Sequence, residues 1–107
     1  MSESVIPLDL KQASRVIRQA LLAGVRVEFT KHAYDEMAAD DLTVLDVHRA
    51  LASCRTVRRD RDPRFGDWKY TVEGTSDRKR IGVVTVIDTD PLGLTIITVW
   101  EVKSRWH

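Results

Sequence analysis

The stretch RIGVVTVIDTDPLGLTIITVWEVK, residues 80–103, gives the clearest indication of the fold class of this chain. It contains two apolar runs, residues 80–88 and 94–103. In each run, apolar side chains occupy both faces of the expected strand, as they do in strands that lie inside a sheet. The segment DTDPLG between the runs has the aspartate, proline and glycine residues that are typical of a turn. The stretch therefore predicts two central strands that are joined as a hairpin.

Two more strands are expected on the N-terminal side of this hairpin. In WKYTVEG, residues 68–74, apolar and polar side chains alternate, which indicates a strand with one buried face. RTVRRD, residues 55–60, has a similar period, and the polar segment GTSDRK predicts a turn before the hairpin. Strands that follow one another this closely favour an antiparallel meander.

Helices are expected in the N-terminal half. Apolar residues recur at helical spacing over residues 8–23 and again after residue 43, a further helix is expected over about residues 31–39, and the alternating segment 25–29 predicts a short strand. The expected N-caps are Asp9, Thr30 and Thr43. This order predicts one α+β domain over residues 1–107, with helices packed on one face of a mostly antiparallel sheet that ends in a β-meander.

The composition excludes several classes of protein. Cys54 is the one cysteine in the chain, so neither an internal disulfide nor a cysteine-based zinc site is expected, and a reducing compartment fits. No apolar run approaches the roughly 18 residues of a membrane span, and the N-terminus lacks the pattern of a secretion signal. We therefore expect a cytoplasmic protein with no membrane association.

Motifs for cofactor and metal binding are missing from the sequence. The five glycines do not have the spacing of a phosphate-binding or dinucleotide-binding loop. The three histidines, His32, His48 and His107, are far apart, and no nucleophile elbow occurs. We expect neither a metal nor another cofactor.

Charge is distributed unevenly along the chain. Residues 27–46 carry one base against six acids, whereas residues 47–80 carry ten bases against five acids. A basic half can bind a polyanion even when the net charge of the whole chain is only +1. A clustered but merely solvated surface is the alternative interpretation.

The predicted late strands carry both bases and aromatic rings. A sheet face commonly binds single-stranded RNA with positively charged side chains that contact the phosphates and aromatic rings that stack on the bases. Trp68 and Trp100 lie in apolar alternations, so we expect them in the core, while Trp106 near the end of the chain is freer to be exposed.

Several stretches together resemble a family of small bacterial proteins called domain of unknown function 4258. They are FTKHAYDEM, LTVLDVHRAL, KYTVEG, IGVVTVI and LTIITVWEV, spread over residues 27–103. The family signature is matched by the pair His32–Ala33, by Met37, and by the Ile-Thr-Val-Trp run at residues 97–100.

The chain also departs from the family pattern. Glu36 stands where the family usually has an arginine, and Asp40 and Asp41 stand where it often has an Arg-Gly pair. Two expected bases are therefore acids in this chain, which argues against a catalytic role for the second predicted helix.

The resemblance implies a fold and a function. Family members look like relatives of the RelE, BrnT and MqsR toxins, which implies a RelE-like fold, here with an extra N-terminal helix. It also implies the toxin of a type II toxin–antitoxin pair that acts as a metal-independent mRNA endoribonuclease. The implied partners are a cognate antitoxin, of which a YgiT-type zinc-finger protein is one kind, and RNA, including ribosome-bound mRNA.

Four residues are the catalytic candidates for such a nuclease. Lys69 and Arg80 could contact phosphate and stabilise the developing charge. Tyr70 could donate a proton or stack on a base, and His32, kept neutral at a helix N-terminus, could accept a proton. The alternatives are solvated surface cations for Lys69 and Arg80, a core position for Tyr70, and a structural role at the start of the helix for His32.

A wider set of residues is expected to bind RNA. These candidates are Arg58, Arg59, Arg78, Lys79, Lys103, Trp106 and His107. For Arg58 and Arg59 the alternative is an edge strand that charge protects from pairing, and for His107 it is a frayed tail.

Two functions other than a nuclease remain open. The same face could bind RNA or a partner protein without cutting it. The first predicted helix, where Arg15 and Arg18 flank an apolar stripe, could instead pack against other proteins in a complex.

Overall fold

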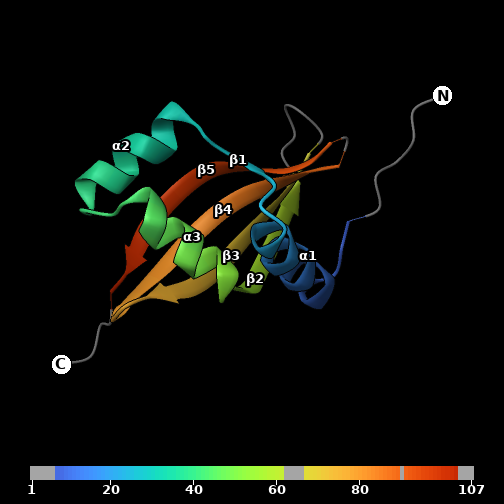
Figure 1. Ribbon diagram of the computed structural model, residues 1–107, viewed down its shortest axis with the longest axis horizontal. Helices are drawn as coiled ribbons and strands as arrows, with labels where there is room; N and C mark the ends of the chain where they lie inside the picture. Colours follow the sequence, from blue (N-terminus) through green and yellow to red (C-terminus); the bar gives the residue numbers. More distant parts are fainter. Residues whose placement is uncertain (1–6, 62–66, 90, 104–107) are drawn as a thin grey trace.

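The computed structural model describes residues 7–61, 67–89 and 91–103 (Figure 1). Two predicted RNA-binding residues, Trp106 and His107, lie outside the described residues. The elements are α1 (Leu10–Leu22), β1 (Arg26–Phe29), α2 (Lys31–Ala39), α3 (Val44–Ala52), β2 (Arg55–Arg61), β3 (Trp68–Ser76), β4 (Lys79–Thr89) and β5 (Leu92–Val102). Each predicted helix and strand is present, with bounds that differ from the predicted ones by a few residues at most.

The strands form one mixed sheet with the order β1-β5-β4-β3-β2. Strands β2 to β5 form an antiparallel meander, and β1 adds a parallel strand at the edge beside β5. Strands β4 and β5 each have a neighbour on both sides, which confirms the central position that their apolar sequences predict. The predicted α+β class is confirmed.

Local sequence explains where the helices begin and end. Each predicted N-cap accepts a hydrogen bond from the backbone of the first helical turn: Asp9 from Gln12, Thr30 from Ala33 and Thr43 from Asp46. Helix α1 ends before Gly24, whose φ of +71° is a conformation that glycine adopts without a steric penalty.

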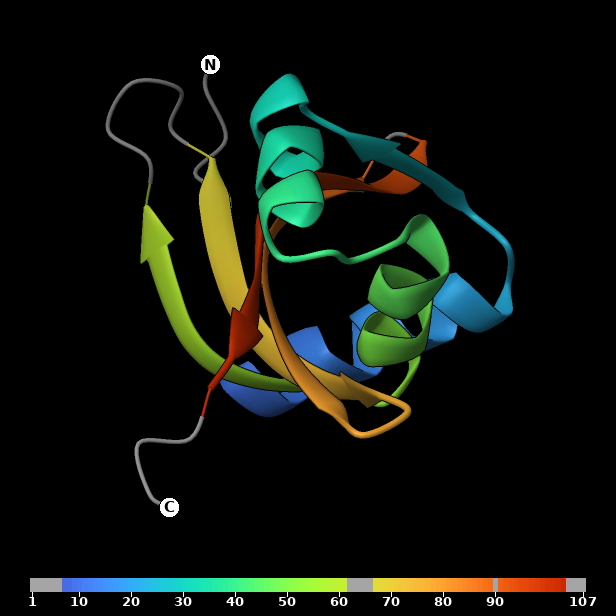
Figure 2. The ribbon, with the colours of Figure 1, turned by 90° about the vertical axis from the view of Figure 1, so that its left-hand side faces the viewer.

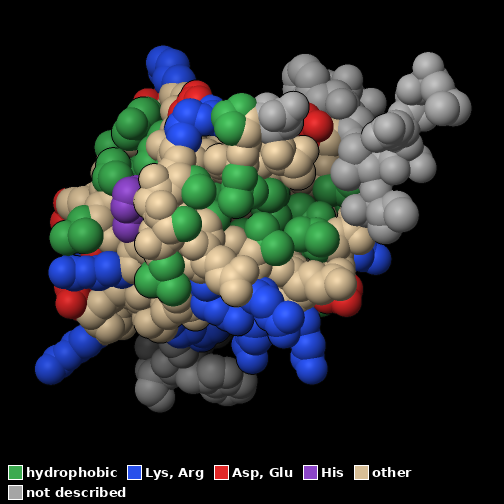
Figure 3. Space-filling model, turned by 45° about the vertical axis from the view of Figure 1, so that its right-hand side comes forward, with side chains coloured by type: hydrophobic (Ala, Val, Ile, Leu, Met, Phe, Trp, Pro, Cys, Tyr) green, Lys and Arg blue, Asp and Glu red, His purple; other side chains and the backbone are tan. Residues whose placement is uncertain are grey.

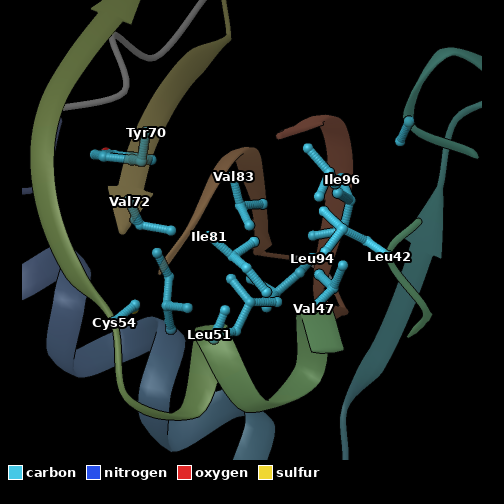
Figure 4. Packing of buried hydrophobic residues seen from close by; sticks show 14 of the residues in the cluster. Leu42, Val47, Leu51, Cys54, Tyr70, Val72, Ile81, Val83, Leu94 and Ile96 are labelled. Atoms are coloured by element: carbon cyan, nitrogen blue, oxygen red, sulfur yellow. The ribbon is translucent and has the colours of Figure 1, made fainter. Parts of the chain in front are cut away.

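The three helices pack on the same side of the curved sheet (Figure 2). Their apolar residues and those of one sheet face form a single core (Figure 4). The largest fully buried side chains include Ile17, Val47, Leu51, Val72, Ile81, Val83, Leu94, Ile96 and Val99. In the described residues, no helix is long and apolar enough to cross a membrane.

Helix α3 lies directly on strand β3. A Cβ atom added at Gly74 would lie 1.9 Å from the carbonyl oxygen of Ala50, so only a glycine allows the two backbones to come this close. This contact fixes which face of the sheet the helices cover, and therefore which face they leave open.

Candidate functional site

The three described helices all pack on one face of the sheet, and no other described helix or strand covers the opposite face, which we call the open face. Strand alternation and pairing register define the side chains that belong to it. They are Arg55, Arg58 and Asp60 of β2, Lys69, Thr71, Glu73 and Thr75 of β3, Arg80, Gly82, Val84 and Val86 of β4, and Thr95, Thr98, Trp100 and Val102 of β5. Most are partly or fully exposed, in contrast to their buried neighbours in sequence.

One row of paired residues crosses the open face from β2 to β5. It consists of Arg55, Glu73, Gly82 and Trp100, each opposite the next in the sheet register. A Cβ atom added at Gly82 would lie 2.2 Å from the indole ring of Trp100, so this ring lies over the backbone of β4 at Gly82. The row therefore presents an aromatic platform beside a carboxylate and a guanidinium.

Arg80 joins this row through an ion pair. Its Nη2 atom lies 2.8 Å from Oε1 of Glu73, whose side chain is 27% exposed. The two residues and Arg55 line an open pocket that also includes Ser53, Gly74 and Thr75. We call Arg55, Glu73, Arg80 and Trp100 the Arg–Glu–Trp site. Its guanidinium groups can bind phosphate, its carboxylate can accept a proton, and its indole can stack on a base.

Lys69 lies on the open face but outside the Arg–Glu–Trp site. It is paired with Val86, six residues along β4 from Arg80, which corresponds to about 20 Å at the rise of a strand. Lys69 and Arg80 can therefore contact one extended RNA strand, but they cannot act on the same phosphorus atom.

Tyr70 and His32 lie away from this face. Tyr70 is on the helix-covered side and 4% exposed, and its Oη accepts a hydrogen bond of 3.0 Å from the backbone N–H of Leu8. Figure 4 shows Tyr70 among the packed residues of the core. His32 is exposed on α2, where its Nε2 lies 3.6 Å from Oε1 of Glu36. The structure therefore favours the core position for Tyr70 and separates His32 from Lys69 and Arg80.

The family signature around His32 is structural in large part. Ala33 and Met37 are buried in the core. The departures from the family pattern also have structural roles, because Asp40 accepts a hydrogen bond from the backbone N–H of Glu101 and joins the end of α2 to β5. Asp41 has a φ of +57°, a conformation that aspartate tolerates better than most residues.

The predicted RNA-binding residues divide into two groups. Arg58 lies on the open face, where it pairs with Asp60, while Arg78 and Lys103 are exposed at the ends of strands. Arg59 instead donates a hydrogen bond to the carbonyl of Leu8 and lies over the ring of Trp68. Lys79 donates to the carbonyl of Asp41. Arg59 and Lys79 therefore connect parts of the fold.

Three members of the Arg–Glu–Trp site were not singled out from the sequence. Trp100 was expected in the core because β5 is apolar on both faces. The alternation of side chains along one strand does not show which of its two faces the helices cover. Arg55 lies in the predicted strand of residues 55–60 and Glu73 in that of residues 68–74, but neither was a candidate site residue. The available signal was the alternation of Lys69, Thr71 and Glu73, which marks the polar side of β3.

The described residues hold no group of three or more histidine, cysteine, aspartate or glutamate side chains that could bind a metal ion. Cys54 is buried, and this burial raises the pKa of its thiol to about 11. The thiol therefore stays protonated at neutral pH, which makes Cys54 a poor nucleophile.

These features define a small α+β protein with helices on one sheet face and an arginine–glutamate–tryptophan row on the other. A family model described as Domain of unknown function (DUF4258) matches residues 29–101, and the chain belongs to this family. The match confirms the family resemblance seen in the sequence. Searches of curated proteins and of solved structures found no match.

Proposed function

We propose that this protein is a metal-independent endoribonuclease that binds single-stranded RNA on its open face and acts as the toxin of a type II toxin–antitoxin pair. The observation that carries the proposal is the Arg–Glu–Trp site. Two arginines and Glu73 line its pocket, and the indole of Trp100 lies over Gly82, which is opposite Glu73 in the sheet register. Phosphate contacts, proton transfer and base stacking are the three interactions that RNA cleavage at such a site needs.

The chemistry requires little from the protein because RNA carries its own nucleophile, the 2′-hydroxyl. Fixed cations stabilise the negative charge that develops on the phosphate, and this is often the largest contribution to catalysis. Arg80 forms an ion pair with Glu73, and Arg55 lies opposite Glu73 in the sheet register. On the open face, Arg58 lies one row of paired residues from Glu73, and Lys69 lies two rows away. They therefore bind the RNA backbone on one side of the cleaved bond.

The toxin part of the proposal rests on the family resemblance to RelE-like proteins. It gives the protein an antitoxin partner, with a YgiT-type zinc-finger protein as one kind, and mRNA as the substrate, free or bound to the ribosome. Inducing the protein alone in a bacterium is then expected to arrest growth, and co-expression of the antitoxin is expected to restore it.

The direct test is cleavage of a single-stranded RNA by the purified protein in the presence of EDTA. Wild type is expected to give a 2′,3′-cyclic phosphate and a 5′-hydroxyl, and Arg80→Ala is expected to slow cleavage about 10²-fold or more. Lys69→Ala is expected to weaken RNA binding while cleavage of saturating RNA continues. Lys31→Ala removes an exposed cation from α2, on the other side of the sheet, and is the control that should leave both activities unchanged.

A non-catalytic RNA- or protein-binding module of the same fold is the second candidate. It is favoured by the acids at positions 36, 40 and 41, where the family usually has bases or glycine, and by the pairing of Arg80 with Glu73. Binding of RNA by wild type without any cleavage, in EDTA or with ribosomes present, would select this alternative.

Docking of another protein on the helix side has one supporting observation. Apolar side chains gather in the centre of the view in Figure 3, with lysine and arginine side chains below them. The exposed large apolar residues of the helices include Leu22, Tyr34 and Leu45. Of the two α1 arginines expected to flank a docking stripe, Arg18 instead donates a hydrogen bond of 2.7 Å to the carbonyl of Cys54.

A further inference from the structure

We infer that Glu73 is the base that removes the proton from the RNA 2′-hydroxyl, an inference that rests on the proposed nuclease function. Glu73 is the one acidic residue among the described residues that line the pocket. Its side chain is mostly covered yet still 27% exposed, so the carboxylate is held in place and can be reached from solvent. Glu73 belongs to the KYTVEG stretch, one of the motifs that carry the family resemblance.

The pairing of neighbouring strands places the carboxylate of Glu73 close to where a nucleobase stacked on Trp100 would lie. Gly82 lies opposite Glu73 on β4, and the indole of Trp100 lies over Gly82. Because adjacent strands are about 4.8 Å apart, the backbone of Glu73 is one strand spacing from the ring. A nucleotide whose base stacks on Trp100 can therefore place its ribose and phosphate over β3 and β4, beside Glu73 and Arg80.

Arg80 can contact the carboxylate of Glu73, the proposed general base, and bind the RNA phosphate at the same time. Its guanidinium carries five N–H donors, and one terminal nitrogen, Nη2, is used by the contact with Oε1 of Glu73. The remaining N–H groups can donate to a phosphate oxygen. Arg55, which is paired with Glu73 in the sheet register, is the second cation for the same phosphate.

The proposed step balances without any further reactant. The carboxylate of Glu73 takes the proton of the 2′-hydroxyl, the 2′ oxygen forms a bond to phosphorus, and the bond from phosphorus to the 5′ oxygen breaks. Water protonates the leaving 5′ oxygen, and the hydroxide that remains takes the proton from Glu73. The products are a 2′,3′-cyclic phosphate and a 5′-hydroxyl, and the carboxylate is regenerated.

Other carboxylates of the open face serve as controls for this role. Asp60 has an arginine partner at the same distance as Glu73 does, since the Nε of Arg58 lies 2.8 Å from its Oδ2. It is opposite Lys69, at the other end of β3 from the pocket. Asp60→Asn therefore removes a carboxylate paired with arginine from the same face without touching the Arg–Glu–Trp site.

The test compares Glu73→Gln, Glu73→Asp and Asp60→Asn for cleavage and for binding of one single-stranded RNA in EDTA. Binding is measured with the same RNA carrying a single 2′-deoxy group at the cleaved position, which no variant can cleave by this route. Glu73→Gln is expected to bind this RNA at least as tightly as wild type and to cleave the unmodified RNA about 10²-fold to 10⁴-fold more slowly. Glu73→Asp should keep part of the cleavage rate. Asp60→Asn frees Arg58 and can change RNA affinity, but it should cleave saturating RNA within about twofold of the wild-type rate.

The outcomes separate the role of Glu73 from the function itself. Normal cleavage by a folded Glu73→Gln would overturn the inference and leave the nuclease function standing. Parallel loss of binding and cleavage in Glu73→Gln would also overturn it, because Glu73 would then only hold the site together. If Glu73→Gln has a lower melting temperature than wild type, the Glu73→Asp variant decides. A loss of cleavage in Glu73→Asp equal to that in Glu73→Gln then overturns the inference. Absence of cleavage by wild type would remove both the nuclease function and this inference.

Discussion

Tyr70 joins the sheet to the segment before the first helix. Its Oη accepts the N–H of Leu8, and Arg59 donates to the carbonyl of the same residue, so two strands hold this segment in place. Because a tyrosine used in this way cannot also reach the open face, the residue has a structural role.

Tyr70→Phe is therefore expected to lower the free energy of unfolding by about 1 kcal/mol, the usual contribution of one hydrogen bond, and to leave the rate of RNA cleavage unchanged. Chemical denaturation and the EDTA cleavage assay check the two effects. A variant as stable as wild type but with cleavage reduced by an order of magnitude would show that Tyr70 takes part in catalysis.

Gly82 controls the position of the Trp100 ring. Gly82→Ala adds a methyl group where the indole carbons lie within 2.8 Å, so the ring must turn away from β4. We expect a loss of about 1–3 kcal/mol of stability from this overpacking, together with weaker binding of single-stranded RNA. Thermal melting and an RNA titration measure both.

Val84→Ala is the control for Gly82→Ala, since residue 84 is the next open-face position on the same strand. It alters β4 without adding an atom beside the indole, so RNA affinity should stay close to that of wild type. Unchanged RNA affinity in a folded Gly82→Ala would rule out Trp100 as the platform for a base.

The capping box of helix α3 gives the fold a dependence on pH. The pKa of Asp46 is lowered from its ordinary value of 3.8, mainly by the hydrogen bond from the backbone N–H of Thr43 and next by the hydroxyl of Ser76. Folding therefore favours the ionised carboxylate. Its contribution to stability is present above about pH 4 and is lost as the pH falls through the lowered pKa.

Asp46→Asn is expected to be less stable than wild type at pH 7 and to lose less further stability on acidification below pH 4. Denaturant unfolding at several pH values measures this difference, with Asp35→Asn as the control because Asp35 is an exposed residue that pairs with Lys31 across one helical turn. Parallel pH curves for Asp46→Asn and wild type would contradict the assignment.

The helices and strands were predictable because their signals are local. Capping residues such as Thr30 and Thr43 act within one turn, and strand periodicity is read over a few residues. Strand β1 shows the limit of this reasoning, since its parallel pairing with β5 depends on how the chain crosses the sheet. The face to which Trp100 and Tyr70 belong depends equally on where the helices pack.

Over the whole molecule, the distribution of acidic and basic segments partly matches the two sides of the sheet. The acid-rich segment 27–46 includes β1, α2 and the start of α3, whereas the base-rich segment 47–80 includes β2 and β3. The open face mixes cations with the carboxylates of Asp60 and Glu73, so its attraction for RNA depends on particular side chains. Net charge alone could have predicted neither Arg55 nor Glu73 as part of a site.

We propose that the open face of the sheet binds RNA, and two charge-matched pairs of substitutions distinguish this face from the helix side. Arg58→Ala with Arg80→Ala removes two ion-paired cations from the open face. Lys31→Ala with Arg49→Ala removes two ion-paired cations from the helix side. Both variants change the net charge by the same amount.

The measurement is the affinity of each variant for a single-stranded RNA over a range of salt concentrations. We predict that the open-face variant binds more weakly and that its dependence of log affinity on log salt is smaller by about one to two units, because phosphate contacts release bound counterions. The helix-side variant should follow the wild-type line. Equal weakening by both pairs, or a larger effect of the helix-side pair, would contradict the claim that RNA binds on the open face.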